Sequence, residues 1–192
     1  MYDLLPTLTG RRVLLREARP DDGDALFRHT SDPEVTRFLA FEPPAALDDT
    51  LAFLARSVEY RRQDREYVFI IENIERDEPV GVISLRHLDR EMASAQVGTW
   101  VARPLWGEGV NTEAKELLLG YGFGPLALHR IEARIVTTNL RSQRAFEKLG
   151  ARREGVLRES FPKQGRFLDT YLYAILSHEW QRRAALGRGS GA

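Results

Sequence analysis

Residues 103–119 read RPLWGEGVNTEAKELLL, and this stretch decides the fold class of the chain. Gly107 and Gly109 lie between an expected strand end and an expected helix start. Glycine lets the backbone turn sharply, and a helix N-terminus presents free N–H groups with partial positive charge. Such a loop suits a pyrophosphate, although the same glycines also suit an ordinary strand-to-helix turn. The loop alone leaves both interpretations open.

Two commoner phosphate-binding loops do not fit these residues. A dinucleotide-binding loop needs an acidic residue at the end of the next strand, about 20 residues further on. That strand ends here in Val136, Thr137 and Thr138. The nucleotide triphosphate loop GxxxxGK[ST] is absent, because Lys115 lies too far from Gly109 to supply its lysine. Both kinds of nucleotide loop are therefore disfavoured.

Hydrophobic periodicity predicts the elements on either side of this loop. Before it we expect a strand at 13–16, two short helices within 19–40, a helix over 48–62 and antiparallel strands at 67–72, 80–88 and 93–101. After it we expect a helix ending near 122, a strand at 131–136, a helix over 142–149, strands at 152–158 and 166–175, and a short helix around Trp180. This order predicts one α/β domain over residues 1–186, with a mixed, mostly antiparallel central sheet flanked by helices. Residues 187–192 are predicted to be a disordered tail.

The composition excludes several classes of protein. The chain has 192 residues, of which 43% are apolar, and Lys plus Arg equals Asp plus Glu at 28 each. No global positive field is available to attract nucleic acid or an anionic membrane, so neither partner is expected. No cysteine is present, which excludes disulfides and thiolate zinc sites. The four histidines show no HExxH spacing, so no metal is predicted. Without a signal peptide or a long apolar run, a cytoplasmic location is expected.

The stretch WGEGVNTEAK resembles the GNAT superfamily of N-acyltransferases, and most closely its Rim-type branch of ribosomal-protein N-terminal acetyltransferases. Residues 137–159, TTNLRSQRAFEKLGARREGVLRE, are similar to that branch's Asn-x-x-Ser helix, Leu-Gly stop and Glu-Gly-x-Leu-Arg strand. Trp106 and Asn111 depart from the general superfamily pattern of Gln or Arg, x, x, Gly, x, Gly or Ala. The likeness covers most of the chain from 101 to 169 and implies a GNAT-like fold.

The resemblance also implies that acetyl-CoA is the cofactor. The loop would bind its pyrophosphate through backbone N–H groups, and Val101 would pair along the pantetheine as an added strand does. The expected cofactor-binding residues are Val101, Trp106, Gly107, Glu108, Gly109, Val110, Asn111, Thr112, Asn139 and Arg144. The simpler interpretation of Asn139 is a helix N-cap.

Two catalytic roles follow from the same likeness. Many relatives carry, seven residues after the Asn, a Tyr that protonates the leaving thiolate, and here that residue is Phe146. Ser142 or solvent would then supply the proton. Strand 93–101 carries no carboxylate, so the base would be Glu154 or Glu159 acting through a water, with Glu159 preferred. The simpler interpretation of either glutamate is an exposed ion pair.

The expected reaction is transfer of an acetyl group to a primary amine, with the N-terminal α-amine of a protein as the favoured acceptor. Small amines such as antibiotics or polyamines, or an inactive CoA-binding module, are the alternatives. An α-amine with an ordinary pKa near 8 is roughly 250-fold more neutral at pH 7 than a lysine near 10.4, which suits a weak base. Relatives are commonly homodimers. The sequence leaves the oligomeric state of this protein undecided between a monomer and such a homodimer.

Overall fold

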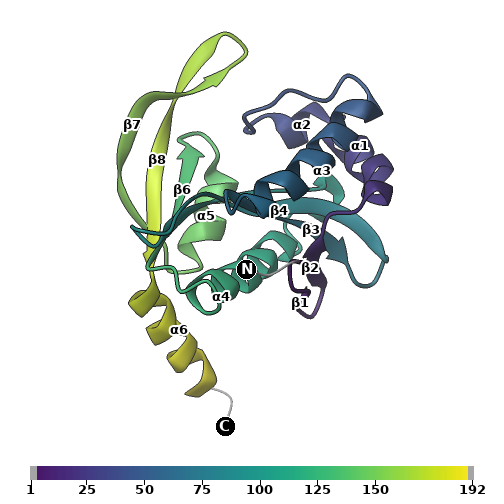
Figure 1. The fold of residues 1–192 in the computed structure, drawn as a ribbon. Coiled ribbons are helices and arrows are strands. Elements are labelled where there is room, and N and C mark those ends of the chain that lie inside the picture. The colour runs from purple at the N-terminus through teal and green to yellow at the C-terminus, as the bar shows by residue number, and fades with distance from the viewer. Residues whose placement is uncertain (1–3, 190–192) are drawn as a thin grey trace.

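The computed structural model describes residues 4–189 (Figure 1). The strands of these residues form one 8-stranded sheet in the order β1-β2-β3-β4-β5-β6-β8-β7. The strands are β1 Leu8–Thr9, β2 Val13–Glu17, β3 Glu66–Asn73, β4 Glu78–Asp89, β5 Ser94–Val101, β6 Arg130–Val136, β7 Arg152–Lys163 and β8 Arg166–Leu176. Neighbours pair antiparallel except β5 and β6, which are parallel. The sheet confirms the prediction of a mixed, mostly antiparallel architecture.

The helices connect and cover these strands. They are α1 Gly23–Thr30, α2 Pro33–Thr36, α3 Leu47–Arg62, α4 Val110–Phe123, α5 Leu140–Glu147 and α6 Ser177–Gly189, with 3₁₀ turns η1 Pro20–Asp22 and η2 Arg103–Leu105. The sequence missed β1, and it ended β7 at residue 158, five residues before Lys163. Helix α6 continues into the segment 187–192, and residues 190–192 of that expected tail lie outside the described residues.

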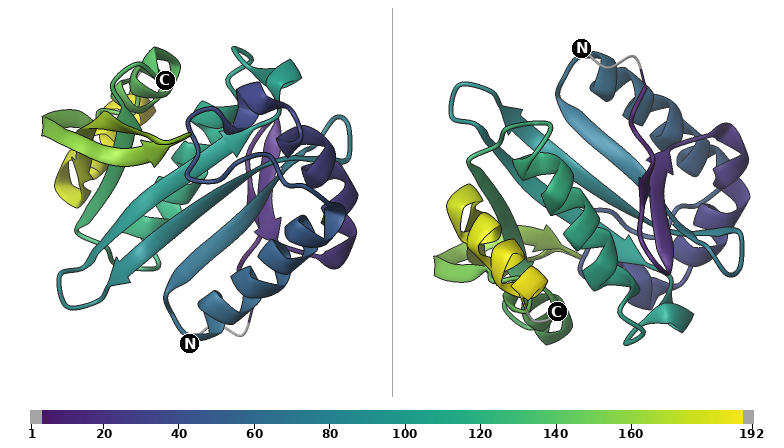
Figure 2. Two further views of the ribbon diagram at one scale, coloured as in Figure 1. Left: turned by 90° about the horizontal axis from the view of Figure 1, so that it is seen from above. Right: turned by 90° about the horizontal axis from the view of Figure 1, so that it is seen from below.

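Helices pack on both faces of the sheet. Val68 and Ile70 on β3 pack in the cluster that contains residues of α1 and α3. Phe69 and Ile71, which alternate with them along the strand, pack in the cluster that contains residues of α4. Figures 1 and 2 show α1, α2 and α3 on one side of the sheet and α4 on the other. Burial on both faces explains why β3 reads as a continuous apolar run rather than an alternating one. The expectation that Leu118 of α4 is buried is confirmed, with 0% exposure.

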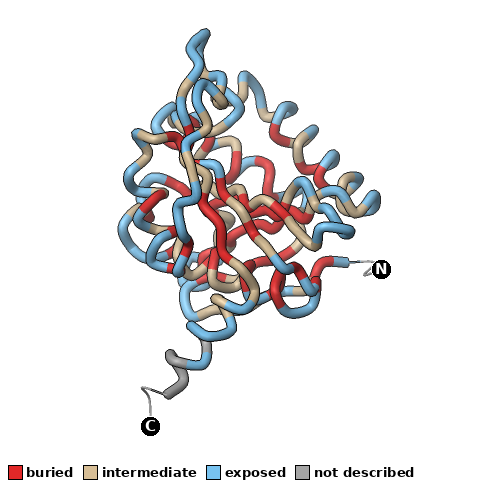
Figure 3. Tube along the Cα trace, turned by 90° about the vertical axis from the view of Figure 1, so that its left-hand side faces the viewer, coloured by how far each residue is buried: buried red, intermediate tan, exposed pale blue. Residues whose placement is uncertain are grey.

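The buried part of the trace runs through the centre of the sheet, and exposure increases toward the β7–β8 hairpin (Figure 3). A buried charge network fastens β2 to the first helices. The Arg16 guanidinium donates 3.0 Å to one Asp22 oxygen and also bonds the Glu72 carboxylate of β3. Both of these carboxylates raise the pKa of Arg16 further, and an arginine that stays charged in the interior needs such partners.

The single parallel pair opens the sheet. Pairing between β5 and β6 covers only residues 94–96 and 130–132. Val97 to Val101 then pair with β4 alone, and Ala133 to Val136 pair with β8 alone. Two strands that diverge leave backbone groups on their facing edges without a strand partner. The opening between them is where the site lies.

Candidate active site

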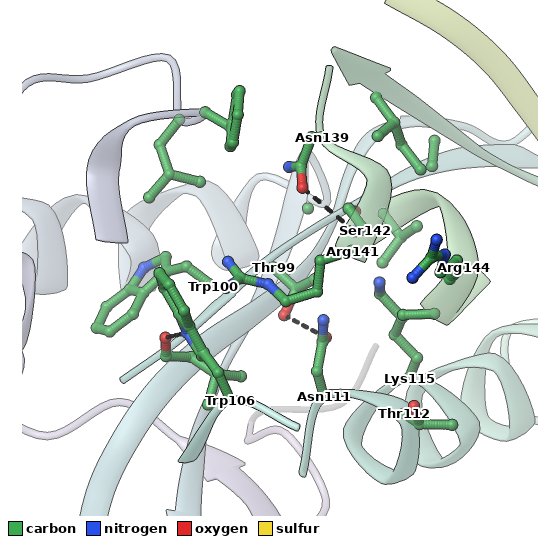
Figure 4. Close-up of a pocket in the computed structure, with 18 of the residues that line it drawn as sticks. Thr99, Trp100, Trp106, Asn111, Thr112, Lys115, Asn139, Arg141, Ser142 and Arg144 are labelled. Carbon is green, nitrogen blue, oxygen red and sulfur yellow. Dashed lines mark hydrogen bonds between the residues drawn. The ribbon is translucent and has the colours of Figure 1, made fainter. Parts of the chain in front are cut away.

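A cleft of about 410 Å³ lies where β5 and β6 separate. Its walls come from the end of β5, the loop before α4, the end of β6 and the first turns of α5, with α2 at one end. Figure 4 shows the polar side chains of these segments pointing into this space. The parallel register brings the carboxyl ends of β5 and β6 to the same edge, so residues some 40 apart in sequence meet there.

Both loop glycines have left-handed backbones. Gly107 has φ 89° and Gly109 has φ 83°, a region that other residues adopt only with strain. A Cβ at either position would meet nothing within 4 Å. These glycines are therefore needed for the backbone conformation and not for close packing, and the space beside both of them is open. Gly109 is the N-cap of α4, so the N–H groups of the following first turn have no partner within the helix.

The side chains at the start of α4 are occupied elsewhere. Val110 is buried in the core at 1% exposure, and the Asn111 Oδ1 accepts 3.3 Å from the Thr99 hydroxyl on β5. Glu113 accepts a 2.9 Å bond from the backbone N–H of Arg12. The start of α4 thus offers mainly backbone N–H groups to a ligand. The expected cofactor residue Glu108 is exposed and is not part of the cleft wall.

Trp106 joins the loop to both walls of the cleft. Its indole N–H donates 2.7 Å to the Val101 carbonyl, and the Arg141 guanidinium stacks on its ring at 3.3 Å from the centroid (Figure 4). Burial lowers the pKa of Arg141, and the charge of Glu34 opposes this effect. One backbone group of Val101, expected to pair with pantetheine, is therefore already bonded within the protein.

Asn139 and Ser142 lie at the start of α5 on the opposite wall. The Asn139 Oδ1 accepts 3.2 Å from the Ser142 backbone N–H, so Asn139 does form the N-cap. Gln143 fixes the same turn by donating 2.8 Å to the Thr137 carbonyl. Ser142 and Arg144 both line the cleft, as do Trp106, Gly109 and Thr112 from the expected set. The structure thus brings most of the predicted residues to one place.

The two carboxylates considered as bases do not reach the cleft. Glu159 is exposed on an irregular part of β7, and its backbone N–H donates 2.8 Å to Asp169. Glu154 bonds the Arg130 guanidinium, which holds the pKa of that carboxyl below its usual range. Within residues 4–189, Glu34 at the end near α2 is the carboxylate in the cleft wall. No local sequence motif identifies Glu34 as a site residue, because the α2 end of the cleft is formed by segments that are distant in sequence.

Sequence reasoning also missed Lys115. Its side chain lines the cleft from the second turn of α4, yet the residue is only 2% exposed. Its amino group lies 5.6 Å from the centroid of the Phe146 ring. Burial lowers the pKa of Lys115 from 10.5 to about 8. The available signal was its position on α4 between Ala114 and Leu118, both of which pack in the core.

Across the described residues 4–189, no group of three or more His, Asp or Glu side chains is arranged to hold a metal ion. Within the same range, no helix combines the length and apolar character needed to cross a membrane.

A mixed sheet that opens between two parallel strands, with a glycine-capped helix N-terminus at the opening, defines a GNAT-type α/β domain. Residues 12–152 match the acetyltransferase (GNAT) domain family, and the chain belongs to that family. It is 31% identical to the uncharacterized N-acetyltransferase p20 of Bacillus licheniformis over 92% of this chain and 99% of that protein. The protein is thus an N-acetyltransferase.

Solved structures of acetyltransferases have the same fold as this chain. A GNAT-family acetyltransferase from Bacillus anthracis superposes with a TM-score of 0.80 at 29% identity, over 91% of this chain and 100% of that one. The RimJ protein of Mycobacterium smegmatis, solved with CoA-disulfide, gives a TM-score of 0.80 at 28% identity, over 92% of this chain and 90% of that one. Relatives of this family therefore bind CoA. The uncovered loop and the unpaired edges of β5 and β6 fit such a ligand here.

Proposed function

We propose that this protein transfers the acetyl group of acetyl-CoA to a primary amine, with the N-terminal α-amine of a polypeptide as the preferred acceptor. The observation that carries the proposal is the uncovered helix N-terminus at Gly109, which faces a cleft between two diverging strands. Backbone N–H groups and the helix dipole at such a terminus bind phosphate oxygens.

The residues that would hold CoA follow from their positions. The backbone of the loop from Trp106 to Thr112 would receive the pyrophosphate, and the free edge of β5 near Val101 would run along the pantetheine. Arg141 and Arg144 on α5 would face phosphates, where guanidinium groups bind oxyanions in pairs of hydrogen bonds. When bound, acetyl-CoA supplies an activated acyl group as a thioester.

Ser142 is the hydroxyl that we assign to the leaving sulfur. It lies on the cleft wall next to the N-cap Asn139, and its backbone N–H is held by that cap. The cap fixes the first turn of α5, so the hydroxyl needs little reordering to donate a hydrogen bond. Replacing Ser142 with Ala should lower turnover about tenfold or more while CoA affinity stays unchanged. Unchanged turnover would remove this assignment.

Glu34 is a stronger candidate for the base than Glu159. Glu34 lines the cleft and is about half exposed, whereas Glu159 lies outside the cleft wall. A carboxylate must reach the amine proton directly or through one water. Glu34→Gln should therefore lower kcat/KM more than Glu159→Gln, and the reverse order would restore Glu159 as the base.

The charge of the cleft favours an acceptor with few positive charges. The cationic side chains that line it are Arg86, Lys115, Arg134, Arg141, Arg144 and Lys148. Glu34 is the single opposing carboxylate in the wall formed by the described residues. A polyamine would bring several like charges into this field, while an α-amine brings one. This balance supports a peptide N-terminus over a polyamine.

A lysine joins two distant segments beside the α2 end of the cleft. Lys163 at the end of β7 donates 2.8 Å to the Phe41 carbonyl and lies 2.9 Å from a Glu42 oxygen. This links the β7–β8 hairpin to the segment after α2, near the cleft-lining Leu39.

The test has two stages. Calorimetry first measures CoA binding by the intact protein, and absence of binding would overturn the proposal as a whole. Release of the CoA thiol is then followed with free-N-terminus peptides, N-blocked lysine peptides, spermidine and aminoglycosides. Turnover confined to free N-termini is the expected result. If N-blocked lysine peptides or small amines react and free N-termini do not, the acceptor assignment is wrong.

A further inference from the structure

We propose that Lys115 gives the proton to the departing CoA sulfur, with Ser142 as the hydrogen-bond donor beside it. This inference rests on the proposed function and names a residue that the Asn-x-x-Ser pattern does not contain. It starts from three facts: Lys115 is buried, it lines the cleft, and it lies against Phe146 on the wall that carries Ser142.

The position of the amino group is unusual for a lysine. Figure 4 shows Lys115 extending from α4 toward α5, on the same side of the cleft as Ser142 and Arg144. Its Nζ lies 5.6 Å from the centre of the Phe146 ring. Among residues 4–189 the structure gives this amino group no hydrogen bond and no ion pair. A buried lysine without a carboxylate partner is costly, and an open cleft is the one direction from which a partner can come.

The charged groups that line the cleft together with Lys115 are mainly cationic. They are Arg141 and Arg144 from α5, Lys148 directly after α5, Arg134 from β6 and Arg86 from β4, with Glu34 from α2 at the far end. Burial favours loss of a proton from Lys115. The surrounding positive charges favour an anion in the cleft, where a thiolate forms as the acetyl group leaves.

Chemical elimination singles out Lys115 among the groups of the cleft wall. Guanidinium groups do not release a proton at neutral pH, and an ionised Glu34 accepts protons rather than donating them. A serine hydroxyl forms hydrogen bonds but does not ionise in this range, and Phe146 has no proton to give. Lys148 is exposed at the rim. Burial lowers the pKa of Lys115 to about 8, close to the ordinary value of about 8.5 for a thiol.

The proton balance of the step is complete with these groups. The acceptor nitrogen forms a bond to the acetyl carbon and loses one proton to the base or to solvent. The carbon–sulfur bond breaks and its electron pair stays on sulfur. Lys115 transfers one proton from Nζ to that sulfur and becomes a neutral amine, a form that burial tolerates. It takes a proton from solvent before the next turnover.

A direct readout exists because the protein has no cysteine. In its complex with CoA, the CoA thiol is the one thiol present, so ultraviolet thiolate absorbance titrates that group alone. The complex with S-methyl-CoA serves as the blank for tyrosine ionisation. The titration compares wild type, Lys115→Met and Lys148→Met, since both variants remove one positive charge from the cleft wall.

We expect the pKa of the bound thiol to be at least about one unit higher in Lys115→Met, which is a tenfold loss of thiolate near pH 8. Lys148→Met should leave that pKa unchanged. In steady-state assays, Lys115→Met should lower kcat about 100-fold with little change in the KM for acetyl-CoA. Lys115→Arg keeps the charge but holds its proton too tightly, so it should keep the low thiol pKa while turnover stays low.

Three results would overturn the inference. The bound thiol could keep the same pKa in Lys115→Met, or Lys148→Met could raise it as much as Lys115→Met does. Alternatively, Lys115→Met could lose CoA affinity by tenfold or more, which would make Lys115 a phosphate ligand. These outcomes differ from failure of the proposed function, in which wild type itself binds no CoA.

Discussion

The Arg141 guanidinium lies 3.3 Å from the centroid of the Trp106 ring and joins the two walls of the cleft. Trp106 follows β5, and Arg141 lies in the first turn of α5, the helix that follows β6. A guanidinium on the face of an indole is a favourable cation–π contact, and the planar group stays available at its edges for hydrogen bonds. Arg141 is thus held in the cleft before any phosphate arrives.

Replacing Arg141 with Met should weaken CoA binding about tenfold in low salt, because it removes a pre-positioned cation. The dependence of affinity on salt should also become shallower. Calorimetry at two salt concentrations measures both effects. Arg28→Met is the control, since Arg28 pairs with Glu78 outside the cleft wall. Equal affinity in Arg141→Met and wild type would show that Arg141 packs on Trp106 without serving CoA.

The left-handed backbone at Gly109 gives a second prediction. Gly109→Ala should cost about 1–2 kcal/mol of folding free energy, because an L-residue is strained at φ 83°. CoA affinity should fall tenfold or more, since the new Cβ projects into the uncovered space above the loop. Denaturant unfolding and calorimetry measure the two effects.

The matched control is Gly120→Ala on the same helix. Gly120 is an exposed helical residue, and a Cβ there also meets nothing within 4 Å. The substitution should stabilise the protein by up to about 1 kcal/mol through helix propensity and leave CoA affinity unchanged. A gain of stability in Gly109→Ala as well would contradict the backbone argument.

Asn139 gives a third prediction, because it caps α5 through its Oδ1 and is also expected to contact CoA. Asn139→Ala should cost about 1 kcal/mol through loss of the cap. Asn139→Asp keeps the acceptor oxygen but loses the amide N–H₂ group and adds a negative charge. It should restore stability without restoring CoA affinity. If Asp restores both, Asn139 acts as a cap alone.

The order of strands and helices could be predicted because each element carries its own periodicity. The unbroken apolar run of β3 and the glycine pair before α4 are local signals that tertiary packing did not override. The two-residue strand β1 was missed, since its pairing with Leu14 and Leu15 of β2 leaves no pattern of its own. The end of β7 was misplaced because an irregular pairing with β8 lies between Leu157 and Phe161.

The site was harder to predict than the fold. The loop and the Asn139 turn were found because each is a compact motif in sequence. Glu34 and Lys115 were missed because neither belongs to a motif in the sequence. The packing of α2, α4 and α5 brings both side chains to the cleft wall. Glu159 was preferred as a strand carboxylate near the motif, but the strand presents it to solvent.

The last prediction concerns Lys115 and the pH dependence of stability. Its pKa is about 8 in the folded protein and 10.5 when solvated, so the folded state binds fewer protons between these values. Below pH 8 the buried charge destabilises the protein by about 3 kcal/mol. This penalty is relieved as pH rises from 8 to 10.5, because the folded protein then holds a neutral amine. Lys115→Met should therefore be more stable than wild type at pH 7, and the difference should shrink toward zero near pH 10.

Urea unfolding at several pH values measures the difference, with Lys148→Met as the control. Lys148 is exposed, so its removal should change stability little at any of these pH values. The difference between variant and wild type cancels the tyrosine ionisations that both proteins share, including Tyr67 and Tyr173, whose pKa values burial raises to about 12. A difference in unfolding free energy that stays constant from pH 7 to pH 10 would mean that Met packs better than Lys for reasons of shape alone. If the difference in unfolding free energy disappears as the pH rises, Lys115 is charged in the folded protein at neutral pH, as a proton donor to the sulfur must be.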